Sequence, residues 1–130
     1  MKKIEVVAAA IFSACETELF IARRLKDTHQ GGLWEFPGGK KEASETPEQA
    51  LYRELKEELG IKIKSSQSLI KLSHDYGDKL VELDVYRVNE FDGEPFGAEG
   101  QETRWIKLQQ LKEYEFPEAN KAIVELLLNA

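Results

Sequence analysis

The sequence predicts an α/β (α+β) fold in which helices cover a mixed β-sheet. Three observations support this class. Strand-length apolar runs and helical segments follow one another, but without the regular strand–helix–strand alternation of a parallel sheet. The segment 47–59 has clear helix signals: Thr46 as the capping residue, Pro47 at the first helical position and Gly60 as the stop. Val81–Val85 alternates apolar and acidic residues, which is typical of a half-buried strand.

The strands and loops follow in order along the chain, each marked by its composition. β-Branched and other apolar runs indicate strands, and clusters of glycine and polar residues indicate loops. A final amphipathic helix is expected at Pro117–Leu128, with Ile123, Leu126 and Leu127 on its buried face. Trp105 is expected in the core. The expected strands are Ile4–Phe12, Leu19–Arg24, Ile61–Lys64, Ile70–Ser73, Val81–Val85 and Arg104–Leu108, and the main loops are Asp27–Leu33 and Phe91–Gly100.

Length and composition limit both the organisation and the partners. At 130 residues, 42% of them hydrophobic, the chain is long enough for one packed domain, 1–130, and too short for two. The net charge of −6 argues against binding to polymeric nucleic acid, which requires a basic surface. The apolar run Val6–Phe12 has the length of a strand, so no membrane span is expected. A single cysteine, Cys15, excludes an internal disulfide and suits a cytoplasmic protein.

The first helix carries a group of acids on one face. Glu54, Glu57 and Glu58 are spaced i, i+3, i+4, so they lie together at the border of the apolar stripe. Like charges at i, i+4 destabilise a helix by about 0.2–0.5 kcal/mol, and no lysine follows four residues after Glu54 or Glu57. One interpretation is a solvated charged face. The other is a magnesium site, since Mg²⁺ prefers oxygen ligands, and two such ions could activate a water and neutralise a leaving phosphate.

These acids belong to a longer pattern with fixed spacing. It reads Gly39, five residues, Glu45, seven residues, Arg53-Glu54-Leu55, one residue, Glu57-Glu58, one residue, Gly60-Ile61. The pattern resembles the Nudix box at every fixed position, which places the box at 39–61. The resemblance implies the Nudix fold, an α/β/α sandwich around a mixed sheet, and a hydrolase. It implies bracing contacts by Arg53 and Glu45, and metal ligands at Glu54, Glu57, Glu58 and the carbonyl of Gly38.

Segments outside the box are similar to the MutT branch of that family. They are Trp34–Lys40, Gly93-Glu94-Pro95, Glu99-Gly100-Gln101 and Phe116–Asn120. This resemblance implies hydrolysis of 8-oxo-dGTP to 8-oxo-dGMP and pyrophosphate, by attack of water on the β-phosphorus, which cleans the nucleotide pool. It places Glu99 at the metal, and either Glu54 or Glu99 as the general base. Mg²⁺ is the expected cofactor, with Mn²⁺ as a substitute.

Asn120 is the expected reader of the base. Its amide offers both a donor and an acceptor, which matches the O6 and N7–H of oxidised guanine. The alternative is that Asn120 caps the last helix. Phe36 either lines the base pocket or belongs to the core, and His29 either contacts substrate or is solvated. The resemblance also places Arg24, Glu35 and Lys40 near the nucleotide, and Lys79 stands where the branch often carries arginine.

Other functions remain open from the sequence. A Nudix pyrophosphatase acting on CTP, a modified pyrimidine triphosphate or ordinary dNTPs is one alternative. A non-catalytic nucleotide-binding module is another, although such a module is expected to lose box glutamates, and all of them are present here. A monomer is the default expectation for the oligomeric state.

Overall fold

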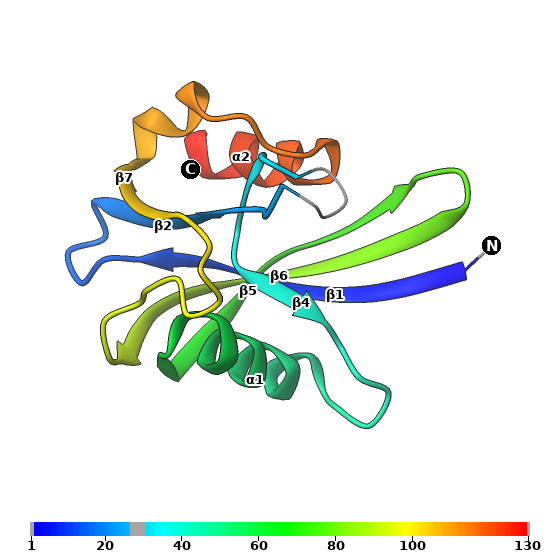
Figure 1. Cartoon of the computed structure of the whole chain (residues 1–130), viewed down its shortest axis with the longest axis horizontal. Helices are drawn as coiled ribbons and strands as arrows, with labels where there is room; N and C mark the ends of the chain where they lie inside the picture. Colours follow the sequence, from blue (N-terminus) through cyan, green and yellow to red (C-terminus); the bar gives the residue numbers. More distant parts are fainter. Residues whose placement is uncertain (1, 27–30, 130) are drawn as a thin grey trace.

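The computed structural model describes residues 2–26 and 31–129. Within them, seven strands form one sheet in the order β3-β2-β1-β6-β5, with β4 also paired to β1 and β7 to β2. Helix α1 covers one face of the sheet, and α2 with the short 3-10 helices η1 and η2 covers the other (Figure 1). The predicted sandwich around a mixed sheet is therefore confirmed. The helices are α1 (Pro47–Leu59), η1 (Leu108–Glu113), η2 (Glu118–Asn120) and α2 (Lys121–Leu128), and the strands are β1 (Lys2–Phe12), β2 (Glu18–Arg23), β3 (Trp34–Glu35), β4 (Gly38–Lys40), β5 (Lys62–Asp75), β6 (Lys79–Asp92) and β7 (Thr103–Lys107).

The centre of the sheet is a parallel pair that the local sequence does not reveal. β1 and β6 run parallel from the pair Lys2–Lys79 to the pair Ile11–Val88. β5 then pairs antiparallel with β6 to make a long hairpin. The two short strands predicted at Ile61–Lys64 and Ile70–Ser73 are one strand, and β6 extends well past the predicted Val85. The bulges in β5 and its exposed polar residues obscure the alternation from which a strand is recognised.

Helix α1 begins and ends where the sequence predicted. The Thr46 hydroxyl accepts the backbone N–H of Gln49, and the Gln49 side chain accepts the backbone N–H of Thr46. This capping box satisfies donors that would otherwise be left without a partner at the N-terminus. Gly60 closes the helix in the left-handed conformation with φ of 70°, which glycine adopts without a steric penalty.

The last helix differs from the prediction at its start. Residues 118–120 form the tighter η2, in which the Asn120 N–H bonds to the Pro117 carbonyl, so α2 begins only at Lys121. Ile123 and Leu127 are buried as expected, but Leu126 is exposed, because the face of α2 that packs on the core carries Ile123, Val124, Leu127 and Leu128 instead.

Two apolar clusters lie on opposite faces of the sheet. Alternate residues of β1 supply them, as the two-residue period of a strand requires. Ala8 and Ala10 pack with the α2 side, whereas Val7 and Ala9 pack with the leucines of α1. Trp105, expected in the core, is only partly buried and packs edge-on against Phe20 with 5.1 Å between ring centres. None of the helices in the described ranges is long and apolar enough to cross a membrane.

Candidate active site

Glu54 lies between helix α1 and strand β4. Its side chain is only 15% exposed and packs directly on Gly39. A β-carbon built on Gly39 would lie 2.1 Å from Glu54 Oε2, so glycine at this position provides the space for the carboxylate. The strand pairing of Gly39 with Val7 and the capped helix together determine where this acid lies.

Arg53 of α1 binds the loop between β4 and α1 and so fixes this loop to the helix. Its Nε and Nη2 donate to the two oxygens of Glu45, at 2.6 and 2.9 Å, which is a bidentate pair. Its Nη1 donates to Glu54 at 2.7 Å, and its Nη2 also donates to the Lys40 carbonyl at 3.1 Å. The guanidinium lowers the pKa of Glu45 to about 2 by hydrogen bonding. Arg53 and Glu45 therefore make the bracing contacts between loop and helix that were expected of them.

The same arginine corrects the expectation of unrelieved repulsion among the helix acids. Besides Glu54, Arg53 Nη1 lies 3.6 Å from Glu57 at i, i+4. The positive charge that relieves this repulsion is Arg53, which precedes the acids along the helix, and not a lysine after them. The side chain of Glu57 is 58% exposed, so the interpretation of a solvated charged face describes this one of the three acids.

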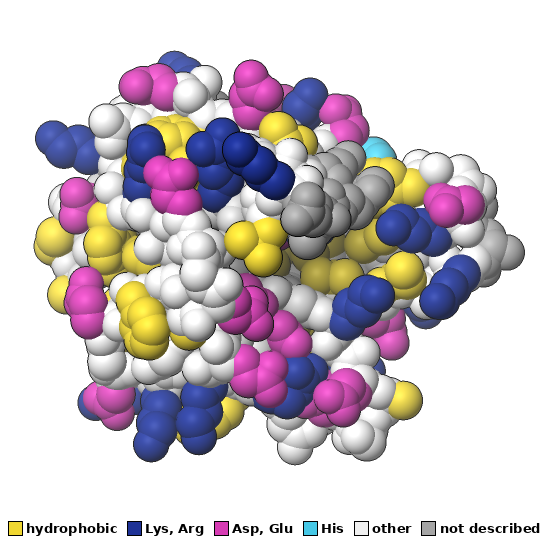
Figure 2. All heavy atoms as spheres, in the orientation of Figure 1, with side chains coloured by type: hydrophobic (Ala, Val, Ile, Leu, Met, Phe, Trp, Pro, Cys, Tyr) yellow, Lys and Arg dark blue, Asp and Glu magenta, His cyan; other side chains and the backbone are white. Residues whose placement is uncertain are grey.

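A second group of acids meets in a hollow of about 190 Å³, named here the acidic hollow. Glu58 from α1, Glu99 from the loop after β6 and Glu35 from β3 line it, with Gly38 at the edge. Burial, followed by the hydrogen bond and charge of Glu54 and the charges of Glu35 and Glu99, raises the pKa of Glu58 to about 9. Acidic side chains gather near the middle of the face shown in Figure 2. The other lining residues are Arg23, Arg24, Leu25 and Gln101.

The donor set fits a hard divalent cation. All the donors are carboxylate or carbonyl oxygens, and their mutual repulsion is what a bound cation would relieve. Among the described residues, no three acidic, histidine or cysteine side chains are gathered closely enough to hold an ion by themselves.

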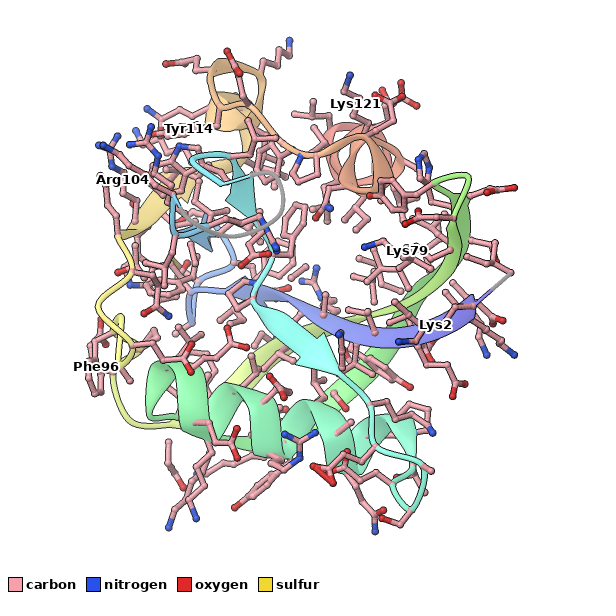
Figure 3. All side chains as sticks on the ribbon, turned by 45° about the vertical axis from the view of Figure 1, so that its right-hand side comes forward. Lys2, Lys79, Phe96, Arg104, Tyr114 and Lys121 are labelled. Carbon is pink, nitrogen blue, oxygen red and sulfur yellow. The ribbon has the colours of Figure 1, made fainter. Side chains whose placement is uncertain are left out.

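A larger apolar pocket of about 320 Å³ adjoins the acidic hollow. It lies between the β1–β6 sheet, strand β4 and the start of α2, and hydrophobic side chains floor a depression beside the acids in Figure 2. Lys79 of β6 points towards the space below α2 (Figure 3). The pocket brings together the predicted residues Arg24, Glu35, Phe36, Lys40 and Asn120, and adds Tyr76 and Lys79.

Asn120 occupies the N-cap position of α2, but its side chain makes no capping hydrogen bond. The side-chain amide therefore does not cap the helix, and the residue Asn120 lines the apolar pocket. Phe36 is only 3% exposed and stacks on Phe116 with 5.2 Å between ring centres. Both interpretations of Phe36 apply, since it is a core aromatic that also forms part of the pocket wall.

Arg24 and Glu35 form the boundary between the two cavities. Arg24 Nη1 donates to Glu35 Oε1 at 2.7 Å, and both residues line both spaces. Burial raises the pKa of Glu35, although the charge and hydrogen bond of Arg24 oppose this. A phosphate at Arg24 would therefore compete with Glu35 for the guanidinium. His29, predicted to contact substrate, lies outside the described residues.

Two residues of these cavities were not predicted as site residues from the sequence. Tyr76 comes from the turn of the β5–β6 hairpin and lines the apolar pocket. Gln101 lines the acidic hollow beside Glu99. Tyr76 reaches the pocket only because β5 pairs with β6 and β6 pairs with β1, which no local sequence signal predicts. Gln101, in contrast, lies within the Glu99-Gly100-Gln101 segment that resembles the MutT branch.

A family model of the NUDIX domain matches residues 7–126, and the chain therefore belongs to the Nudix family, as the sequence predicted. A protein of Haemophilus influenzae named 8-oxo-dGTP diphosphatase is 42% identical over 98% of this chain and 94% of its own. Its namesake from Escherichia coli is 41% identical over 98% of both chains, and the E. coli CTP pyrophosphohydrolase is 34% identical over 98% of this chain and 93% of its own.

Solved structures agree with the fold. A structure from work on MutT of Aliivibrio salmonicida and Vibrio cholerae superposes with a TM-score of 0.90 at 42% identity, covering 98% of each chain. The MutT NUDIX hydrolase of Burkholderia pseudomallei gives a TM-score of 0.86 at 28% identity, covering 97% of this chain and 98% of its own. The predicted fold class and the predicted enzyme class, a hydrolase of phosphoric anhydride bonds, are confirmed at the level of the family. Nudix hydrolases generally depend on a divalent metal.

Proposed function

We propose that this chain is a Mg²⁺-dependent diphosphatase that hydrolyses 8-oxo-dGTP to 8-oxo-dGMP and pyrophosphate. Two nearly full-length relatives bear that activity in their names, at 42% and 41% identity. The observation that carries the proposal is Asn120, which lines the apolar pocket and makes no side-chain capping bond to the helix that follows it. The acidic hollow adjoins this pocket, so a base in the pocket would direct its phosphates towards the carboxylates.

The discrimination follows from hydrogen-bond chemistry. Oxidised guanine presents a donor at N7 beside the acceptor O6, and one asparagine amide can match both. Ordinary guanine presents two acceptors there, which leaves one polar atom mismatched at a cost of about 1–3 kcal/mol. This corresponds to a preference of about 5- to 150-fold for the oxidised base, because each 1.4 kcal/mol is a factor of ten.

The hydrolytic step uses the acids around α1. Glu54, Glu57, Glu58 and Glu99, with the carbonyl of Gly38, would hold the cation. When bound, the cation would supply positive charge to the triphosphate and would lower the pKa of a water. Either Glu54 or Glu99 accepts the proton of the water that attacks the β-phosphorus. Arg53 directs Glu54 through the 2.7 Å hydrogen bond that its Nη1 donates to Glu54 Oε1.

The remaining partners follow from the same chemistry. Mg²⁺ is the cation, with Mn²⁺ as a substitute, because both accept oxygen donors. The substrate is a small nucleotide and not polymeric nucleic acid, since the net charge of −6 repels a long phosphate chain. We propose a monomer acting in the cytoplasm, where removal of oxidised nucleotide protects DNA synthesis.

The test measures pyrophosphate release from 8-oxo-dGTP, dGTP and CTP, with Mg²⁺ and with the cation removed by a chelator. We expect turnover only with the cation, and a kcat/KM for 8-oxo-dGTP well above those for the other two. Equal values for 8-oxo-dGTP and dGTP would reject the assigned base, and turnover in the chelator would reject the metal.

CTP is the substrate of the second candidate function. The observation in its favour is the E. coli CTP pyrophosphohydrolase, which matches 98% of this chain at 34% identity. A pyrimidine lacks the N7–O6 edge that Asn120 would read, so the Asn120 side chain favours the oxidised purine. A higher kcat/KM for CTP than for 8-oxo-dGTP in the same assay would establish this second candidate.

A further inference from the structure

The loop between β6 and β7 is attached to the C-terminal end of α1. The last carbonyls of a helix have no partner within the helix and require donors from elsewhere. Here the backbone N–H of Phe96 donates to the Leu59 carbonyl at 3.2 Å, and that of Ala98 donates to the Glu58 carbonyl at 3.0 Å. The ring of Phe96 lies over Gly60, beside the end of α1 (Figure 3).

Gln101 adds a side-chain link between this loop and the helix. Its Oε1 accepts the backbone N–H of Glu99 at 2.9 Å, and its Nε2 donates to the Glu58 carbonyl at 3.2 Å. One partner is only a donor and the other only an acceptor, so the orientation of the amide is determined by its neighbours. Glutamate lacks the donor and lysine lacks the acceptor, so neither can make both bonds.

Glu99 depends on this link more than the helix acids do. Its side chain belongs to an exposed residue, so burial does not determine its position. It follows two residues after Gly97, where a β-carbon would lie 2.1 Å from the Gln101 carbonyl. The loop therefore folds closely around Gln101, and the side-chain amide of Gln101 links the backbone N–H of Glu99 to the backbone carbonyl of Glu58.

We infer that Gln101 is a positioning residue, which sets the loop acid Glu99 against Glu58 across the acidic hollow. This inference rests on the proposed function, in which Glu99 serves the cation or the attacking water. Both polar atoms of the Gln101 amide are used in these two hydrogen bonds, so Gln101 acts through Glu99. It acts by keeping two acids from distant parts of the chain at one fixed separation, so that the cation and the triphosphate meet both acids at once.

The test compares Gln101→Met with Gln110→Met. Methionine keeps the length of the side chain and removes both hydrogen bonds. Gln110 is a matched control, because its Oε1 also accepts a backbone N–H, that of Lys107 at 2.8 Å, and it is also partly buried, but away from the hollow. The readouts are kcat and KM for 8-oxo-dGTP, Mn²⁺ binding to the nucleotide-free protein by electron paramagnetic resonance, and the melting temperature.

We expect Gln101→Met to lower kcat by about 10- to 100-fold, the range for residues that orient metal ligands, with a change in KM below about twofold. Mn²⁺ binding should weaken in parallel, while the melting temperature shifts no more than in Gln110→Met. An unchanged kcat, or an equal loss of kcat in Gln110→Met, would overturn the inference.

A double variant separates this inference from the proposed function. If Gln101 acts through Glu99, the pair Glu99→Gln with Gln101→Met should be no slower than Glu99→Gln alone, because residues in one chain of contacts are not additive. Independent, multiplying losses would show that Gln101 does not act through Glu99. Full activity of Glu99→Gln would instead reject the proposed role of Glu99 itself.

Discussion

The contact between Gly39 and Glu54 allows a perturbation whose size can be worked out from the structure. An alanine β-carbon at Gly39 would lie 2.1 Å from Glu54 Oε2, whereas ordinary contact begins at 3.4 Å, so the carboxylate must move by about 1.3 Å. Gly39 is not in the left-handed region, so the backbone tolerates alanine. A misplacement of about 1 Å at a reacting centre costs on the order of 100-fold in rate. We therefore expect Gly39→Ala to lower kcat by about that factor while the protein stays folded.

The assay is steady-state pyrophosphate release with saturating Mg²⁺ and 8-oxo-dGTP, with thermal unfolding followed by circular dichroism. Gly38→Ala is the contrasting variant. Its β-carbon would lie 1.9 Å from the backbone oxygen of Val7, which cannot swing aside, so this variant should lose stability by breaking the pairing of β4 with β1. A Gly39→Ala protein with kcat within about twofold of the parent would refute the reasoning, because Glu54 would then not need its observed position.

Three further predictions concern the helix acids and the base pocket. Glu57→Gln should abolish turnover without changing the melting temperature, because the side chain is 58% exposed, and retained turnover would remove Glu57 from the metal set. Asn120→Ala should lower the ratio of kcat/KM for 8-oxo-dGTP over dGTP by about 5- to 150-fold, with little change in helix stability, because no capping bond is lost. An unchanged ratio would reject base reading by Asn120. The pKa of Glu45 is lowered to about 2 by Arg53, so this pair stabilises the fold above the ordinary pKa of 4.5 and loses its contribution as the pH falls towards 2. Urea unfolding at a series of pH values should show a shallower acid loss in Arg53→Gln, and identical slopes would contradict this.

Features that depend on neighbours along the chain could be predicted from the sequence. Helix α1 follows its capping signals at both ends, and Glu54, Glu57 and Glu58 share a face because of helical spacing alone. The family and the fold class followed from the same pattern. The contact of Arg53 with Glu45 was expected from the resemblance to the Nudix box, and it is present in the structure.

Features that depend on distant pairing could not be predicted in this way. The parallel match of β1 with β6 joins segments far apart in sequence, and no local signal marks it. The polar stretch inside β5 gave no alternation, so one edge strand was divided into two. The late start of α2 and the position of Gln101 arise from tertiary contacts of residues that local rules assign to a helix and to a loop.

The division of the apolar core by the sheet has a consequence for how this protein can change. Asn120 and its pocket lie on the α2 side, while Glu54, Glu57 and Glu58 arise from α1 on the opposite side, and each side has its own apolar cluster. Substitutions in well-separated clusters tend to contribute independently to stability. A lineage could therefore remodel the surroundings of the base for a new nucleotide while the catalytic helix keeps its packing, which is one physical route by which closely similar folds come to accept different substrates.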